Sequence, residues 1–238
     1  MKKIIAVLAA MAVTSISAFA LDITVGARGN YDMFIGTTLE GGTAEYVAGQ
    51  ETTARLAGQS WKEGPNMVGY GFAVYGNFGF LNLGAGTLGA QVEAGMNFNN
   101  GYTVEFGDKA DNRSDMTIDI PVLVTFTFPV SDAFSIGAGV GPYLSIPLGY
   151  DEVVKADNYK ASSWANIKAN MNFGLAFDAN GAFKAGPGSI VLDLRYLMDF
   201  GPTKLNGTDK TTGVRVWNDE ETFTRRGLLI GLGYQITF

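Results

Sequence analysis

Apolar and polar residues alternate along most of the chain, which is the period of a β-strand with one apolar face. In the first such segment, residues 21–35, Leu21, Ile23 and Val25 begin an apolar face, and Asp22 and Thr24 begin the opposite one. Seven more segments follow the same pattern, at residues 68–78, 87–98, 117–128, 134–148, 164–178, 189–200 and 225–238. The pattern predicts eight strands. Each is long enough for a tilted strand to cross a bilayer, which takes ~9–11 residues.

The connections between these segments alternate between long and short. The long, polar connections are residues 37–66, 99–116, 149–163 and 201–222. The short ones are residues 81–86, 129–133 and 179–188, and the last holds the turn formers Asn180-Gly181 and Gly186-Pro187-Gly188. Outer-membrane barrels have an even number of antiparallel strands, long outer loops and short periplasmic turns. We therefore expect an all-β, eight-stranded antiparallel up-and-down transmembrane β-barrel, with both termini of the mature chain in the periplasm.

A soluble barrel of lipocalin type, with its apolar face inside, is the alternative for the same alternation. The apolar faces carry many aromatic residues, and an eight-stranded lumen has room for little more than its own side chains. Closure of a barrel also pairs every strand edge, which a lipid environment requires. These points favour apolar faces that point outward.

The N-terminal residues have the three parts of a secretory signal. Lys2 and Lys3 give a charged start, residues 4–13 are apolar, and Ala18 and Ala20 are the small residues that a signal peptidase recognises. The apolar run is too short to cross a bilayer as a helix. We predict cleavage after Ala20, so that residues 1–20 are the signal peptide and residues 21–238 form one barrel domain.

Composition limits the chemistry that the chain can perform. It contains no Cys and no His, so it forms no disulfide and lacks the most common general base and metal ligand. Its formal net charge is −6, and loss of Lys2 and Lys3 makes the mature chain more acidic. An acidic chain is a poor partner for the phosphates of nucleic acid. We therefore expect no enzymatic activity, no cofactor, no metal and no nucleic-acid partner.

The C-terminal residues place Tyr234, Ile236 and Phe238 on one face and end the chain on an aromatic residue. This ending resembles the signal that the outer-membrane assembly machinery recognises. Over residues 21–238 the chain resembles the small outer-membrane β-barrel proteins, a family that includes the OmpA membrane domain, OmpX and OmpW. The resemblance implies a bacterial outer-membrane location and a monomer. It also implies contact with outer-membrane lipid, the barrel-assembly machinery and periplasmic chaperones.

Charged residues on the polar faces are the candidate functional residues, because an outward apolar face directs them into the lumen. They are Arg28, Asp32, Glu93, Asp119, Lys168, Asp193, Arg195, Asp199 and Arg225. An isolated ion in an enclosed lumen is very costly, so these charges must be paired or hydrated. We expect Arg28 and Arg195 to pair with carboxylates across the lumen. The expected carboxylates are Glu93 and Asp193.

Two classes of function remain open from the sequence. In the first, the chain is a narrow porin-like channel or a structural barrel plugged by its lumen charges. In the second, it is a surface adhesin or host-interaction protein that acts through its extracellular loops. If Glu93 closes a gate, Glu93→Ala raises conductance, whereas an unchanged conductance removes Glu93 from any gate.

Overall fold

The computed structural model describes the backbone of most of the chain. The described residues are 22–34, 38–41, 61–63, 68–106, 109–156, 159–160, 165–169, 171–201, 203–209 and 221–238. Side chains are described for residues 22–33, 68–98, 116–148, 171–201 and 224–238. The predicted cleavage residues Ala18 and Ala20 lie outside these ranges, so the signal peptide stays a prediction.

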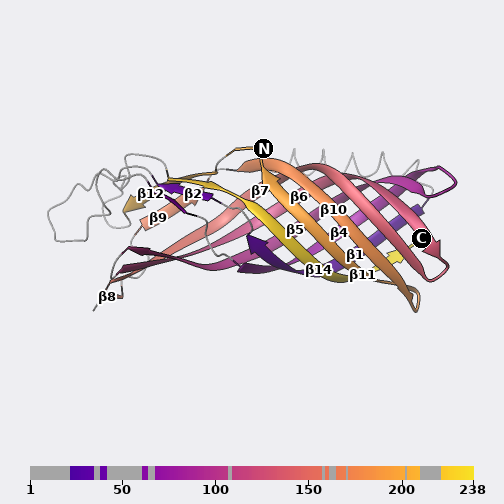
Figure 1. The fold of residues 1–238 in the computed structure, drawn as a ribbon, viewed down its shortest axis with the longest axis horizontal. Helices are drawn as coiled ribbons and strands as arrows, with labels where there is room; N and C mark the ends of the chain where they lie inside the picture. Colours follow the sequence, from indigo (N-terminus) through magenta and orange to yellow (C-terminus); the bar gives the residue numbers. More distant parts are fainter. Residues whose placement is uncertain are drawn as a thin grey trace.

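Eight long antiparallel strands form a closed ring (Figure 1). The strands are β1 (Asp22–Phe34), β4 (Val68–Asn82), β5 (Thr87–Phe106), β6 (Lys109–Ser131), β7 (Phe134–Ala156), β10 (Asn172–Ala185), β11 (Gly188–Asp199) and β14 (Arg226–Thr237). Each strand pairs with the next of these in the chain, and β14 pairs with β1 to close the ring. The fold is an eight-stranded antiparallel up-and-down β-barrel, which confirms the predicted fold class.

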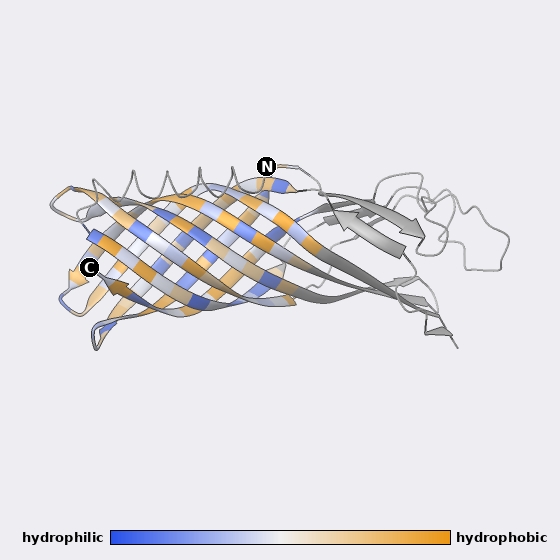
Figure 2. Cartoon of the chain, turned by 180° about the vertical axis from the view of Figure 1, so that it is seen from behind, coloured by the Kyte–Doolittle hydropathy of each residue, from blue (hydrophilic) through white to orange (hydrophobic). Residues whose placement is uncertain are grey.

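The two faces of the barrel wall have opposite character (Figure 2). Large apolar side chains point outward and stay exposed, as in Phe72 at 56%, Val124 at 57% and Leu232 at 63%. The alternate residues point into the lumen and are buried, among them Arg28 and Glu93 at 5% each. This arrangement is the reverse of a lipocalin and matches an apolar solvent outside. Within the described residues, the structure contains no helix long and apolar enough to span a membrane.

Short turns and the end of the chain gather at one end of the barrel. The turns lie at residues 83–86, 132–133 and 186–187, and Gly84 and Gly186 adopt φ values of 80° and 65° that favour glycine. At the same end, the backbone N–H of Phe238 donates to the carbonyl of Ile23 at 2.8 Å. We call this end the lower end, and the end with the longer connections the upper end.

The sixth barrel strand differs from the prediction of residues 164–178. It is β10, which begins at Asn172 and continues through Asn180-Gly181 to Ala185, so the predicted turn at Asn180-Gly181 is wrong. Gly181 pairs with Ile136 and Leu192 on the neighbouring strands, and a Cβ there would lie 3.3 Å from the Phe134 ring. Phe134 in turn stacks on Phe183 with ring centroids 4.3 Å apart. The hairpin turn is the Gly186-Pro187 pair further along.

The predicted long loops at residues 99–116 and 149–163 are largely strand. The hairpin of β5 and β6 stays paired up to Phe106 and Lys109, and β7 continues beside β6 to residue 155. These extensions lie beyond the alternating apolar band, where both faces of a strand can be polar. The added parts of β6 and β7 lack the alternation on which the prediction relied, whereas residues 102–106 of β5 do alternate and were assigned to a loop.

A second, smaller sheet lies near the upper end, away from the C-terminus (Figure 1). It contains β2 (Thr38–Gly41), β3 (Trp61–Glu63), β9 (Ala165–Ala169), β12 (Thr203–Asp209) and β13 (Glu221–Thr224), in the order β3-β2-β13-β12-β9. The two-residue strand β8 (Tyr159–Lys160) pairs with β7. Lys168, predicted in the lumen, belongs to β9, where its backbone pairs with Asn206 rather than with a barrel strand.

Candidate functional site

The lower part of the lumen holds a group of five paired charges, which we call the lower tier: Arg28, Glu93, Asp178, Asp193 and Arg195. One oxygen of Glu93, Oε1, lies 2.8 Å from Arg28 Nη2 and 2.7 Å from Arg195 Nη1. Arg28 also contacts Asp193 at 3.1 Å, and Arg195 contacts Asp178 at 2.7 Å. The five residues come from β1, β5, β10 and β11, so this network joins strands on several sides of the lumen.

Uncharged groups complete the lower tier. Arg28 Nε donates to the side-chain oxygen of Asn30 at 3.0 Å, and its guanidinium carbon lies 5.7 Å from the centre of the Tyr75 ring. Asn180 donates to Asp178 at 3.1 Å. Because buried guanidinium and carboxylate groups need several partners, these contacts reduce the cost of enclosing them.

A second group of charges, the upper tier, surrounds Arg225 nearer the upper end. Its members are Asp32, Asp119, Asp199 and Arg225. The guanidinium of Arg225 contacts Asp32 at 2.6 Å and Asp119 at 2.7 Å. The backbone N–H of Arg225 donates to Asp199 at 2.8 Å, and the Tyr143 hydroxyl donates to the other oxygen of Asp199.

Asp119 is the most heavily bonded carboxylate of the upper tier. Besides the contact with Arg225, it accepts a hydrogen bond from Ser145 Oγ at 2.6 Å and another from Asn97 Nδ2 at 2.7 Å. These donors lie on β7 and β5, the two strands beside β6, which carries Asp119. The sheet register thus places both donors next to the carboxylate.

Glycines facing the lumen make room for these large side chains. A Cβ at Gly233 would lie 2.6 Å from Arg28 Cβ, and one at Gly26 would lie 2.4 Å from the Tyr75 ring. Both pairs are direct neighbours across strands. The high glycine count of the chain, 32 residues, therefore has a steric function, because an eight-stranded lumen barely holds its side chains.

The structure brings eight of the nine predicted lumen charges into the two tiers, and the side chain of the ninth, Lys168, lies outside the described side chains. It adds Asp178, which the sequence analysis did not single out because the sixth strand was misplaced. Asp178 stands directly across from Arg195 in the register of β10 and β11, so a correct strand would have revealed this pair. Tyr234, Ile236 and Phe238 of the predicted assembly signal all face outward.

Acidic groups outnumber basic ones in the described lumen, with three buried Arg side chains against six buried carboxylates. The lower tier has two Arg and three carboxylates, and the upper tier has one Arg and three. Among the described residues, no cluster of three or more His, Cys, Asp or Glu side chains is arranged to hold a metal ion. The arrangement can fill and stiffen the lumen through ion pairs that span it.

The closed ring, the outward apolar face and the enclosed charges define a small β-barrel of the outer-membrane type. No protein-family model and no curated protein matches the chain. Among solved structures, it is similar to the outer membrane protein OprG from Pseudomonas aeruginosa, with a TM-score of 0.61 and 11% identity over 92% of this chain and 96% of that chain. At this identity, the likeness to OprG shows the fold.

Two further solved structures align less closely. The outer membrane protease OmpT from Escherichia coli gives a TM-score of 0.47 with 8% identity, over 91% of this chain and 95% of that chain. Ail, the attachment invasion locus protein of Yersinia pestis, gives 0.38 with 12% identity, over 90% and 98%. These superpositions are too loose to bear on function.

Proposed function

We propose that the chain is an integral protein of the bacterial outer membrane whose lumen is filled by its own side chains and passes no solutes. The observation that carries this proposal is the burial of the lumen. Each charged side chain of the two tiers is at most 7% exposed. A water-filled pore would leave its lining charges exposed, since hydration is the cheapest way to accommodate them.

The apolar outer wall supports the membrane location. Tyr31, Tyr70 and Phe200 are exposed toward the upper end, and Phe128 and Phe238 toward the lower end. Two such aromatic girdles are typical of barrels that span a bilayer. We infer that the lower end, with the short turns and both ends of the mature chain, is periplasmic. Outer-membrane lipid, the assembly machinery and periplasmic chaperones are the partners that this placement requires of a monomeric barrel.

We propose a non-enzymatic role on the same contacts. The carboxylates Asp119 and Asp199 each accept hydrogen bonds from neighbouring side chains or backbone. They have partners in the wall itself, so we assign them to filling the lumen.

Permeability of vesicles tests the sealed barrel. The mature protein, refolded into liposomes, is compared with an equal mass of a general porin in a swelling assay with a small sugar. Folding is checked in the same sample by the difference in gel mobility between unheated and boiled protein. We expect swelling at the rate of protein-free liposomes. Swelling close to that of the porin, from a folded sample, would contradict the proposal.

Surface attachment is the second candidate function, and one observation favours it. Three separate connections between barrel strands contribute to the small five-stranded sheet: β2 and β3 follow β1, β9 follows β7, and β12 and β13 follow β11. A sealed barrel that carries such a sheet is suited to presenting a surface rather than a pore. Protease treatment of intact cells that removes this sheet should abolish adhesion and leave permeability unchanged. Adhesion that survives the treatment would exclude this role.

A further inference from the structure

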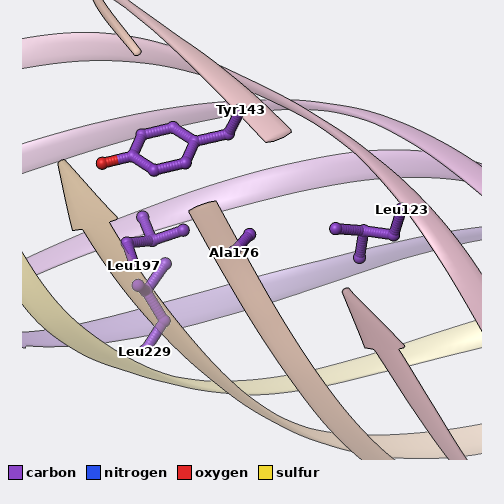
Figure 3. Packing of buried hydrophobic residues seen from close by; sticks show 5 residues of the cluster. All are labelled: Leu123, Tyr143, Ala176, Leu197 and Leu229. Carbon is purple, nitrogen blue, oxygen red and sulfur yellow. The ribbon is translucent and has the colours of Figure 1, made fainter. Parts of the chain in front are cut away.

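An apolar layer separates the two ionic tiers. Along the inward face of β11, Leu197 lies between Arg195 of the lower tier and Asp199 of the upper tier. Ala176 of β10 pairs directly with Leu197, and Leu229 of β14 pairs with Arg195 of the lower tier on one side and with Asp32 of the upper tier on the other. We call the three side chains the septum: Ala176, Leu197 and Leu229. Each is at most 3% exposed, and Figure 3 shows them near the Tyr143 ring in the barrel interior, with Leu123 further away.

Strand pairing places septum residues next to one another and next to glycines. Ala176 pairs with Leu197 on one side and with Gly141 on the other, and Leu197 pairs with Gly227. A Cβ at Gly141 would lie 2.0 Å from the Val122 carbonyl oxygen of β6, so no larger residue fits there.

The ionic tiers do not cross this layer. All ion pairs among the described residues lie within one tier or the other, and none joins the lower tier to the upper one. An ion that entered either tier would find charged side chains there that can compensate its charge. To continue, it would have to pass the apolar side chains of the septum, which offer an unpaired ion no compensating contact.

We propose that the septum, and not the ion pairs, determines that water and ions do not pass. This inference rests on the proposed sealed barrel and names the residues that seal it. Breaking an ion pair leaves the apolar layer in place, so the lumen stays closed. Making the layer polar lets water continue from one tier to the other, and the acidic excess then favours the passage of cations.

Matched substitutions separate apolarity from size. The double variant Leu197→Ser/Leu229→Ser makes the septum polar, and Leu197→Ala/Leu229→Ala removes similar volume but keeps it apolar. An apolar cavity of this kind stays dry. A third variant, Glu93→Gln, removes the carboxylate shared by both lower-tier Arg residues and opens no space. Each is refolded into a planar bilayer and its conductance and reversal potential in a salt gradient are recorded.

We expect the serine pair to show discrete, cation-selective openings where the wild-type trace stays flat, because polar groups remove the barrier to a hydrated ion. The alanine pair and Glu93→Gln are expected to stay at the wild-type level. A silent serine pair that is folded by gel mobility would overturn the inference, as would conduction by the alanine pair or by Glu93→Gln. If the serine pair does not fold, the single variant Leu197→Ser is judged by the same criteria. Conduction by wild type itself would instead refute the sealed barrel.

Discussion

Glu93 is the most informative single residue of the lumen, because one carboxylate oxygen serves two guanidinium groups. Replacement by Ala removes the contacts of 2.8 Å with Arg28 and 2.7 Å with Arg195. Removing one partner of a buried ion pair costs about 3–5 kcal/mol. Arg28 keeps Asp193 and Arg195 keeps Asp178, so neither guanidinium is left without a carboxylate.

The retained partners place the expected loss at the lower end of that range. We predict that Glu93→Ala lowers the free energy of unfolding by about 3 kcal/mol. Glu93→Gln keeps the side-chain volume and a hydrogen-bond acceptor, and we expect a loss of about 1–2 kcal/mol. The measurement is equilibrium unfolding in urea, with the protein in lipid vesicles and the folded fraction read from gel mobility.

The comparison between the two variants is the critical result. If Glu93→Ala lowers the free energy of unfolding by less than about 0.5 kcal/mol, its effect is that of an ordinary surface substitution, and the reasoning is refuted. It would mean that the contacts of Glu93 are replaced by water at no cost. Equal losses for Ala and Gln would show that charge, and not the buried contact geometry, sets the stability.

Two further substitutions test close contacts in the wall and lumen, each by the same unfolding measurement. Gly141→Ala should lower the free energy of unfolding by about 1–3 kcal/mol, because its Cβ would lie 2.0 Å from a backbone oxygen. Gly201→Ala is the control and should be neutral, because nothing lies within 4 Å of a Cβ at Gly201. Equal effects at both sites would contradict the packing. Tyr143→Phe leaves a buried Asp199 oxygen without its donor and should cost about 1–3 kcal/mol. Tyr234→Phe removes an exposed hydrogen bond to the Ala185 carbonyl and should lower stability less than Tyr143→Phe does. A larger loss for Tyr234→Phe would contradict the contacts assigned to the upper tier.

Alternation alone predicted most of the barrel because lipid and lumen impose opposite demands on neighbouring residues. It failed where a second influence was stronger. Asn180-Gly181 has the composition of a turn, yet both residues pair with neighbouring strands on either side. The extended parts of β6 and β7 lie beyond the apolar band and carry no alternating signal, whereas residues 102–106 of β5 alternate and could have been recognised.

Which charged side chains pair inside the lumen depends on the register between strands, and alternation does not determine that register. The residues that face inward were identifiable, but the contact of Arg195 with Asp178 required the correct placement of β10. The septum had a signal that was not used. Leu197 and Leu229 occupy inward positions where the pattern favours polar or small residues, and these exceptions indicate an apolar layer.

Single-channel recording of the refolded wild-type protein in a planar bilayer tests the sealed lumen most directly. Insertion is verified on the same preparation by resistance of the barrel to protease and by its gel mobility. Our account predicts a flat trace at either polarity, because both ionic tiers and the septum between them are buried. Discrete, reproducible openings from an inserted barrel would contradict it and would show that the lumen is a pore.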